Sequence, residues 1–158
     1  MNRIAISFLT ALLLCLASAM PANAGTVAAE DVVGKWQTFK DGRHRSTIEI
    51  YRSEKNTYEG RIVWGEHPGL LDAKNPDPAK RSQVLLGQVI LRDFIYGGEN
   101  KWKSGHIYDP DSGHDYSASM KLAEEGADRN TLLLRGFVGI SLFGRTETWK
   151  RDGASAAK

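Results

Sequence analysis

The sequence predicts an all-β protein: a single antiparallel eight-stranded up-and-down barrel, with a short N-terminal helical turn after a signal peptide. From Lys35 onward, apolar and polar residues alternate along short segments, as in strands with one buried face. Turn residues interrupt the alternation repeatedly and no helical segment separates successive strands, which favours an antiparallel meander. A meander of this size forms a sandwich or a barrel. Because closure removes exposed strand edges, we expect a barrel.

The N-terminal segment has the layout of a cleavable signal peptide. A positive charge at Arg3 precedes an apolar stretch from Leu9 to Ala17, and the small-residue pattern Ala22-Asn23-Ala24 predicts cleavage directly after it. The alternative is an uncleaved membrane anchor, for which the apolar stretch is short. We therefore divide the chain into a signal peptide, 1–24, and a β-barrel domain, 25–158. This domain is expected to be periplasmic or, alternatively, secreted.

Composition limits the partners of this exported domain. The single cysteine, Cys15, lies in the signal peptide, so the exported chain has no disulfide and depends on its core for stability. Positive and negative charges are mixed along the sequence, with a formal net charge of +2 and no basic block. We therefore expect no nucleic-acid partner. No segment after the signal peptide is apolar enough to predict a membrane-spanning helix.

The predicted elements follow in order along the chain. Residues 26–34 suit a short helical turn, with Glu30 and Asp31 near its start. The alternation then predicts strands at 35–40, 46–52, 58–64, 84–92, 101–109, 115–122, 131–138 and 145–151. In the second of these, for example, Ile48 and Ile50 share one face. Residues typical of hairpin turns occur at 40–44, 53–56, 96–100, 110–113 and 124–130.

One connection differs from these short turns. The segment from Gly65 to Gln83 contains three prolines and shows no clear period. A loop of this length in a compact domain is usually functional or forms a lid. Its NPDP sequence supplies the lid candidates Asn75, Pro76, Asp77 and Pro78.

Three glycines interrupt the most hydrophobic run of the exported chain, which extends from Arg135 to Trp149. Glycine is a poor strand former, but it allows the sharp bends and close backbone approach that a small barrel requires. We therefore expect Gly136 and Gly139 to relieve crowding in the seventh strand. We expect Gly144 to serve the tight turn into the eighth strand.

No motif in the sequence predicts catalysis. Pairing across the turn at 110–113 places His114 opposite Asp109 and His106 opposite Ser117, so the two imidazoles are not neighbours and no shared metal is expected. Asp109 or Asp111 is expected to cap backbone N–H groups at this turn. The exported chain has no cysteine nucleophile, no Gly-x-Ser-x-Gly elbow and no phosphate-binding glycine loop. We expect neither an enzyme nor a bound cofactor.

Tryptophans and late arginines are the most informative side chains. Trp36, Trp64, Trp102 and Trp149 all fall on predicted strands. Such residues usually belong to the core, and the alternative is that one or two line a ligand cavity. An arginine of the last strand packed over Trp36 would tie the barrel shut. Arg145 pointing into the lumen would instead anchor an anionic ligand. The sequence leaves both arrangements open.

Two resemblances to known families support the barrel. The sequence VVGKW resembles the opening signature of the lipocalin superfamily, a Gly-x-Trp on the first strand, and this signature implies a late-strand arginine partner such as Arg145 or Arg151. More of the chain resembles the prokaryotic domain of unknown function family 2147. The motifs that carry this resemblance, in order, are GKW, IEIY, NPDP, LLGQVIL, W-x-x-G-x-IYDPDSG-x-x-Y and LRGFVGISLFGRTETWKR.

The second resemblance covers nearly all of the exported chain. It implies an exported, lipocalin-like β-barrel without an established activity, and it supplies no catalytic residues. The sequence departs from the family pattern at His106, His114 and Leu133, where lysine is more usual. This departure argues against a role for the two histidines.

Together these features predict a barrel that binds a small apolar or amphipathic molecule inside or at its mouth. The candidate wall residues are Trp36, Tyr116, Met120, Arg145 and Trp149, with the 65–83 loop as a lid. The alternative is a cell-envelope interaction module that binds a protein or glycan through this loop without carrying a ligand. A third hypothesis is an enzyme whose polar residues converge only in three dimensions. We expect a monomer without a metal or cofactor.

Overall fold

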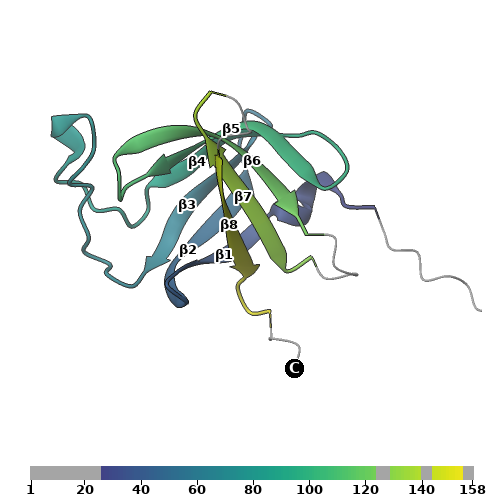
Figure 1. Cartoon of the computed structure of the whole chain (residues 1–158), viewed down its shortest axis with the longest axis horizontal. Coiled ribbons are helices and arrows are strands. Elements are labelled where there is room, and N and C mark those ends of the chain that lie inside the picture. Colours follow the sequence, from purple (N-terminus) through teal and green to yellow (C-terminus); the bar gives the residue numbers. More distant parts are fainter. Residues whose placement is uncertain (1–25, 124–128, 140–143, 155–158) are drawn as a thin grey trace, which may run out of the picture.

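The computed structural model describes residues 26–123, 129–139 and 144–154, so the predicted signal peptide lies outside the described residues. Its strands form one closed barrel in which every strand is antiparallel to its neighbours (Figure 1). The strands are β1 Gly34–Lys40, β2 Arg43–Arg52, β3 Tyr58–Gly65, β4 Val89–Tyr96, β5 Lys101–Asp109, β6 His114–Leu122, β7 Thr131–Phe137 and β8 Gly144–Arg151. The predicted all-β, eight-stranded up-and-down barrel is confirmed.

Helical structure is limited to two short 3-10 turns among the described residues. The turn η1, Ala29–Val32, precedes β1 as the sequence predicts, and η2, Pro78–Lys80, lies in the connection between β3 and β4. No described helix has the length and apolar character needed to cross a membrane.

The fourth strand begins later than predicted. We expected it at 84–92, but β4 runs from Val89 to Tyr96. The residues before it form a turn, in which Gly87 has a φ of +89° and the Gln88 N–H donates to the carbonyl of Leu85 (3.0 Å). The prediction was wrong at this end because an apolar run can supply core residues from a loop as well as from a strand. The long connection therefore extends to Gln88.

The barrel closes through a short seam between β1 and β8. Trp36 pairs with Arg151 and Gln37 with Lys150, and the Asp152 N–H donates to the Lys35 carbonyl (2.8 Å). These two residue pairs are the whole β1–β8 register, although both strands are fully described. The seam is thus sealed at the end of the barrel next to η1 and unpaired toward the other end.

A stacked tryptophan and arginine hold the sealed end. The Trp36 indole is fully buried and donates to the Val32 carbonyl (2.8 Å). The Arg151 guanidinium lies over the indole ring at 4.2 Å and donates to the carbonyl of Val33 (3.0 Å) in the segment after η1. Gly34 leaves room for this arrangement, because a Cβ there would lie 2.8 Å from the guanidinium. The structure therefore selects Arg151 as the arginine that ties the barrel shut.

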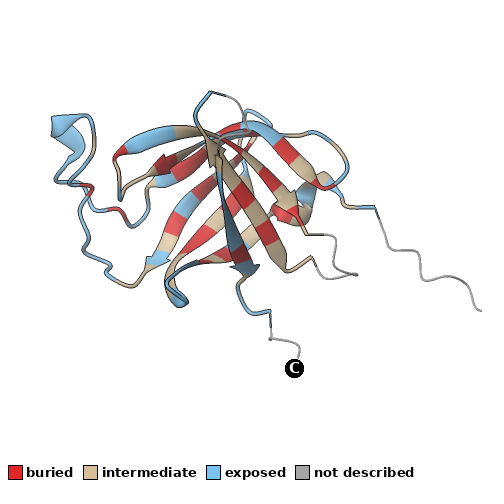
Figure 2. Cartoon of the chain, in the orientation of Figure 1, coloured by how far each residue is buried: buried red, intermediate tan, exposed pale blue. Residues whose placement is uncertain are grey.

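The core follows the predicted alternation of strand residues (Figure 2). Trp36, Trp102 and Trp149 belong to it, whereas Trp64 is 44% exposed and stacks on His44 at a ring distance of 4.3 Å. The other large side chains with almost no exposed surface are Phe94, Ile48, Ile50, Leu91, Met120, Leu122, Leu132, Leu134 and Val32.

Two of the three glycines of the hydrophobic run play other roles than expected. Gly136 relieves no crowding, because a Cβ there would meet Ile107 at an ordinary 3.5 Å. Gly139 is not in β7 but follows it, with a φ of +70°. Gly144 is the first residue of β8, where a Cβ would lie 2.6 Å from the Gly136 carbonyl oxygen. The expectation for Gly136 and Gly139 was wrong because composition does not reveal which cross-strand neighbours approach each glycine, whereas Gly144 does stand at the entry to β8.

Tyr58 is expected to make the free energy of unfolding fall as the pH becomes alkaline. Its hydroxyl donates to Glu30 (3.0 Å), and burial, followed by this hydrogen bond, raises the tyrosine pKa from 10.0 to about 12. Because the folded pKa is the higher one, the stabilisation is fully present below about pH 10 and is lost as the pH rises through about 12. Between about pH 10 and pH 12, Tyr58 should cost the wild-type protein on the order of 2 kcal/mol of unfolding free energy. We expect Tyr58→Phe to remove this part of the loss. Urea unfolding across this range measures it, and identical pH profiles for both proteins would contradict it.

Candidate functional site

A cavity of about 550 Å³ opens at the end of the barrel opposite η1. The second halves of the odd-numbered strands and the first halves of the even-numbered strands surround it, because alternate strands run in opposite directions. Its apolar wall includes Ile62, Leu85, Ile90, Ile107, Leu134 and Trp149. A concave apolar site of this volume is typical of small-molecule binding. The unpaired part of the β1–β8 seam contributes Thr38 and Glu147 to the same wall.

Three of the five predicted wall residues line this cavity: Tyr116, Arg145 and Trp149. Trp36 and Met120 do not. Trp36 is enclosed between η1 and Arg151, and Met120 pairs with Trp102 and Leu134, with 1% of its surface exposed. Alternation predicts which side chains point inward, but it does not predict how deep in the barrel each one lies. Trp36 and Met120 fill the packed half of the barrel.

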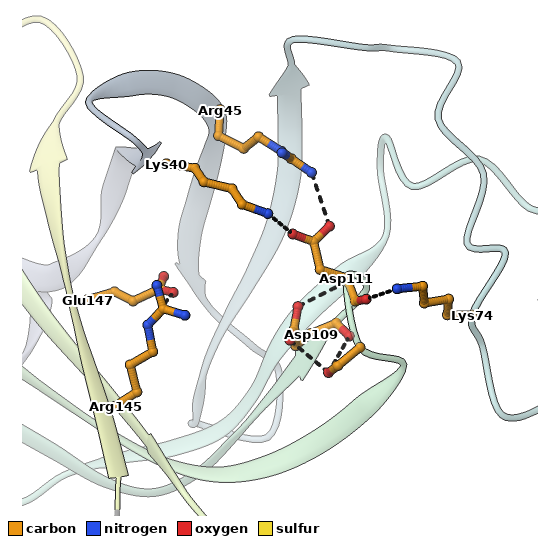
Figure 3. A network of polar contacts seen from close by, with 8 residues as sticks. Lys40, Arg45, Lys74, Asp109, Asp111, Arg145 and Glu147 are labelled. Carbon is orange, nitrogen blue, oxygen red and sulfur yellow. Dashed lines mark hydrogen bonds and ion pairs between the residues drawn. The ribbon is translucent and has the colours of Figure 1, made fainter.

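Charged side chains surround the mouth of the cavity (Figure 3). Lys40, at the end of β1, donates to one carboxylate oxygen of Asp111 (2.8 Å), and Arg45 of β2 donates to the other (3.0 Å). Lys74 donates to the Asp111 main-chain carbonyl (2.5 Å). The hydrogen bond from Lys40 lowers the pKa of the Asp111 carboxyl below its ordinary value; Arg45 acts in the same direction, and burial opposes them.

Arg145 is placed at the rim and not deep in the lumen. Its side chain is 85% exposed, and its Nε lies 4.0 Å from Glu147 on the same strand. Glu147 also accepts a hydrogen bond from the Trp149 indole (3.3 Å). Arg145 is thus exposed at the mouth on β8, across the β1–β8 seam from Lys40 and Arg45 (Figure 3).

The histidine register is as predicted. His114 pairs with Asp109 and His106 with Ser117, so the two imidazoles are not opposite one another. The carboxylate of Asp109 accepts from the Asp111 N–H (3.0 Å) and the Ser112 hydroxyl (2.7 Å), which confirms its expected role in the turn. Within the described ranges, no group of three or more histidine, cysteine, aspartate or glutamate residues could hold a metal ion.

The long connection reaches the mouth with its ends and not with its NPDP sequence. The cavity wall includes residues 65–68, Leu70, Leu85 and Leu86. It does not include residues 75–78. Figure 1 shows η2, which begins in this sequence, projecting away from the barrel. The prediction that Asn75, Pro76, Asp77 and Pro78 form a lid over the cavity is therefore wrong.

Local hydrogen bonds explain the position of NPDP. Asn75 donates to Asp72 (2.6 Å) and accepts from the Asp77 N–H (2.9 Å), and Asp77 accepts from the Ala79 N–H (3.0 Å) at the start of η2. These side chains use their polar groups to shape the loop itself. They are consequently not directed at a ligand in the cavity.

A buried tyrosine–aspartate pair fastens this loop to the barrel. Asp72 has no exposed surface, and its carboxylate accepts from the Tyr108 hydroxyl of β5 (2.6 Å). Burial, followed by the hydrogen bond to Asp72, raises the pKa of Tyr108. Next to this pair, the Lys74 carbonyl packs so closely on Gly113 that a Cβ there would lie 2.0 Å away. The wall formed by the connection is therefore fixed to β5 and to the β5–β6 turn.

Replacing Tyr108 with phenylalanine should loosen the loop. The buried Asp72 carboxylate would lose a hydrogen bond, so we expect the free energy of unfolding to fall by about 1–3 kcal/mol. Trypsin cleavage after Lys74, Lys80 and Arg81, all in the loop, should become faster. Tyr116→Phe is the control, because the only hydrogen bond of that hydroxyl within the described part of the chain is a long one to Ser112 (3.4 Å). Equal cleavage rates in the two variants would argue against Tyr108 as the anchor.

Sequence patterns did not reveal the rim cluster of Lys40, Arg45 and Asp111. These residues lie in or beside two separate predicted turns, at 40–44 and 110–113. In an up-and-down barrel, the turns that follow odd-numbered strands meet at the same end. This topological rule was the available signal, since it brings opposite charges from both turns together.

Comparison with known proteins supports the architecture. Residues 34–151 match the family described as "Uncharacterized protein conserved in bacteria (DUF2147)". A search of curated proteins found no match. Among solved structures, the chain is similar to HP1028 from Helicobacter pylori, whose description places that protein in the lipocalin family. The TM-score is 0.66 and the identity 23%, over 77% of this chain and 83% of HP1028. The protein therefore belongs to the DUF2147 family and has a lipocalin-like barrel.

Proposed function

We propose that this protein binds a small apolar or amphipathic molecule in the cavity at the open end of its barrel. The observation that carries the proposal is the contrast between the two ends. One end is filled by Trp36, Arg151 and η1, while the other encloses about 550 Å³ behind an apolar wall. The similarity to a lipocalin-family structure supports this by analogy of fold. The N-terminal sequence supports export, to the periplasm or the medium.

The cavity could accept an amphipathic molecule with its polar part outward. Aliphatic and aromatic side chains form the inner wall, whereas the cationic groups of Lys40, Arg45 and Arg145 lie at the mouth with their acidic neighbours. An apolar group inside would be removed from water, and a polar group would stay near solvent. This arrangement favours binding with one orientation.

Titration with N-phenyl-1-naphthylamine, a neutral apolar dye that brightens in apolar surroundings, tests the proposal. We expect saturable binding by the wild-type chain. Gly136→Phe should weaken it at least about tenfold, because Gly136 lines the cavity and the added ring would occupy space that the dye needs. Ile95→Phe is the control, since Ile95 is 55% exposed and does not line the cavity. Equal dye binding by both variants, or no saturable binding by the wild type, would refute the proposal.

A second candidate function is contact with an envelope partner through the β3–β4 connection. Leu70, Leu71, Val84 and Leu86 are each 41–45% exposed on this loop. Leucines exposed together are typical of contact surfaces. Co-sedimentation with isolated cell envelopes tests this function: Leu71→Asp combined with Val84→Asp should abolish it while leaving dye binding intact. Unchanged co-sedimentation of this variant would argue against the loop as a contact surface and leave the cavity as the proposed function.

A further inference from the structure

We propose that the molecule bound in the cavity carries a carboxylate head group, which Lys40 and Arg45 bind at the mouth by displacing the Asp111 side chain. This inference rests on the proposed function and specifies the class of ligand. The carboxylate of Asp111 occupies the position proposed for the head group and acts as an internal substitute for it.

The geometry of Asp111 is that of a bound carboxylate. Each of its oxygens has its own cationic donor, Lys40 at 2.8 Å and Arg45 at 3.0 Å. The two cations come from adjoining strands, and Asp111 comes from the β5–β6 turn. All three side chains line the cavity. A ligand carboxylate could therefore replace that of Asp111 without any change in the chemistry of the site.

Among the described residues, Asp111 is the carboxylate that pairs with Lys40 and Arg45, because the other acidic side chains of the rim have partners of their own. Glu66 is paired with Arg43 (2.6 Å), Glu147 lies beside Arg145 and accepts from Trp149, and Asp109 accepts from the turn backbone and Ser112. Lys74 adds a further positive charge at the Asp111 carbonyl. The site thus retains a positive excess when the Asp111 carboxylate leaves it.

Asp111 is able to move because it is half exposed. The exposed fractions of the side chains are 51% for Asp111 and 54% for Lys40, so their ion pair contributes little stability. A second hollow of about 370 Å³ adjoins the main cavity and shares Lys40, Leu70, Leu85 and Asp111 with it. The ion pair therefore lies between two open volumes, with room for a head group and for the displaced side chain.

The apolar wall begins next to this site, which sets the orientation of the ligand. Leu70 and Leu85 line both hollows beside the Lys40–Asp111 pair. A single alkyl chain attached to a carboxylate would place its head between Lys40 and Arg45 and its chain along the inner wall toward Trp149. The head group would stay near solvent, which limits the cost of removing its charge from water.

Calorimetric titration of the exported chain with laurate and with dodecanol tests the inference. The two probes share one alkyl chain and differ in the head group. We expect laurate to bind about tenfold more tightly. Asp111→Asn should strengthen laurate binding several-fold because the internal competitor is neutralised, and Arg45→Gln should weaken it about tenfold. Dodecanol binding should change little in either variant.

Controls separate this inference from the proposed function. Lys35→Met removes an exposed cation near η1, at the other end of the barrel, and should leave both affinities unchanged. Asp111→Glu keeps the carboxylate and should behave like the wild type. Equal affinities for laurate and dodecanol, or weaker laurate binding by Asp111→Asn, would overturn the head-group assignment and leave the cavity function standing. Binding of neither probe would refute both.

Discussion

Replacing Trp36 with alanine is expected to lower the free energy of unfolding by about 3–5 kcal/mol. The indole is fully buried, donates to the Val32 carbonyl and lies under the Arg151 guanidinium at 4.2 Å. Its removal leaves a cavity where η1, β1 and β8 meet. It also leaves Arg151 without the ring on which it stacks. Since β1 and β8 are paired only at this end, the closure of the barrel depends on this contact.

Urea unfolding followed by far-ultraviolet circular dichroism measures this loss without relying on tryptophan fluorescence. Trp64→Ala is the matched control, because Trp64 is 44% exposed, and we expect it to cost less than about 1 kcal/mol. A double-mutant cycle with Arg151→Ala should give a coupling of about 1 kcal/mol between the indole and the guanidinium. Equal losses for the two tryptophans would show that the sealed end does not hold the barrel together.

Replacing Gly105 with alanine is expected to cost about 2–3 kcal/mol of unfolding free energy. A Cβ at this position would lie 2.3 Å from the ring of Phe94, which is itself fully buried on β4. The ring cannot move away without disturbing the core. Ser104, with a φ of +60°, and the register shift between Trp102 and Gly105 further restrict adjustment of the β5 backbone.

Gly136→Ala is the control for this substitution, because it adds the same methyl group to a strand where the nearest atom is 3.5 Å away. We expect it to change the free energy of unfolding by less than about 0.5 kcal/mol. Combining Gly105→Ala with Phe94→Leu should cost less than the sum of the two single changes, since the smaller side chain relieves the clash. Additive losses would mean that the ring does not restrict residue 105.

Because only one end of the barrel holds a cavity, we expect substitutions at the two ends to affect different properties of the protein. Side chains of the packed half, such as Trp36 and Phe94, are expected to affect stability. Side chains of the open half, such as Arg45 and Asp111, are half exposed or paired at the surface, and they are expected to affect binding with little loss of stability. This separation is what allows the proposed ligand site to be tested with folded variants.

Sequence patterns were sufficient for the architecture but less so for the site. Alternation and turn residues predicted the strands, and pairing around the 110–113 turn predicted the register of His106 and His114. Of the candidate wall residues, Tyr116, Arg145 and Trp149 line one cavity, whereas Trp36 and Met120 lie below it. Whether a side chain points into the barrel depends on its place in the alternation along its own strand, which the sequence shows. How deep it lies along the barrel axis depends on the stagger of all the strands, which no single segment of sequence shows.

The sequence alone determined that this chain forms a closed antiparallel barrel, because each strand carries its own alternation of apolar and polar residues and each turn its own backbone preferences. Only the tertiary structure decided which arginine covers Trp36, where the long connection is fastened, and that Lys40 and Arg45 meet Asp111. These contacts join residues far apart in the chain. Their distances depend on barrel closure and strand stagger, which arise from the packing of all the strands together.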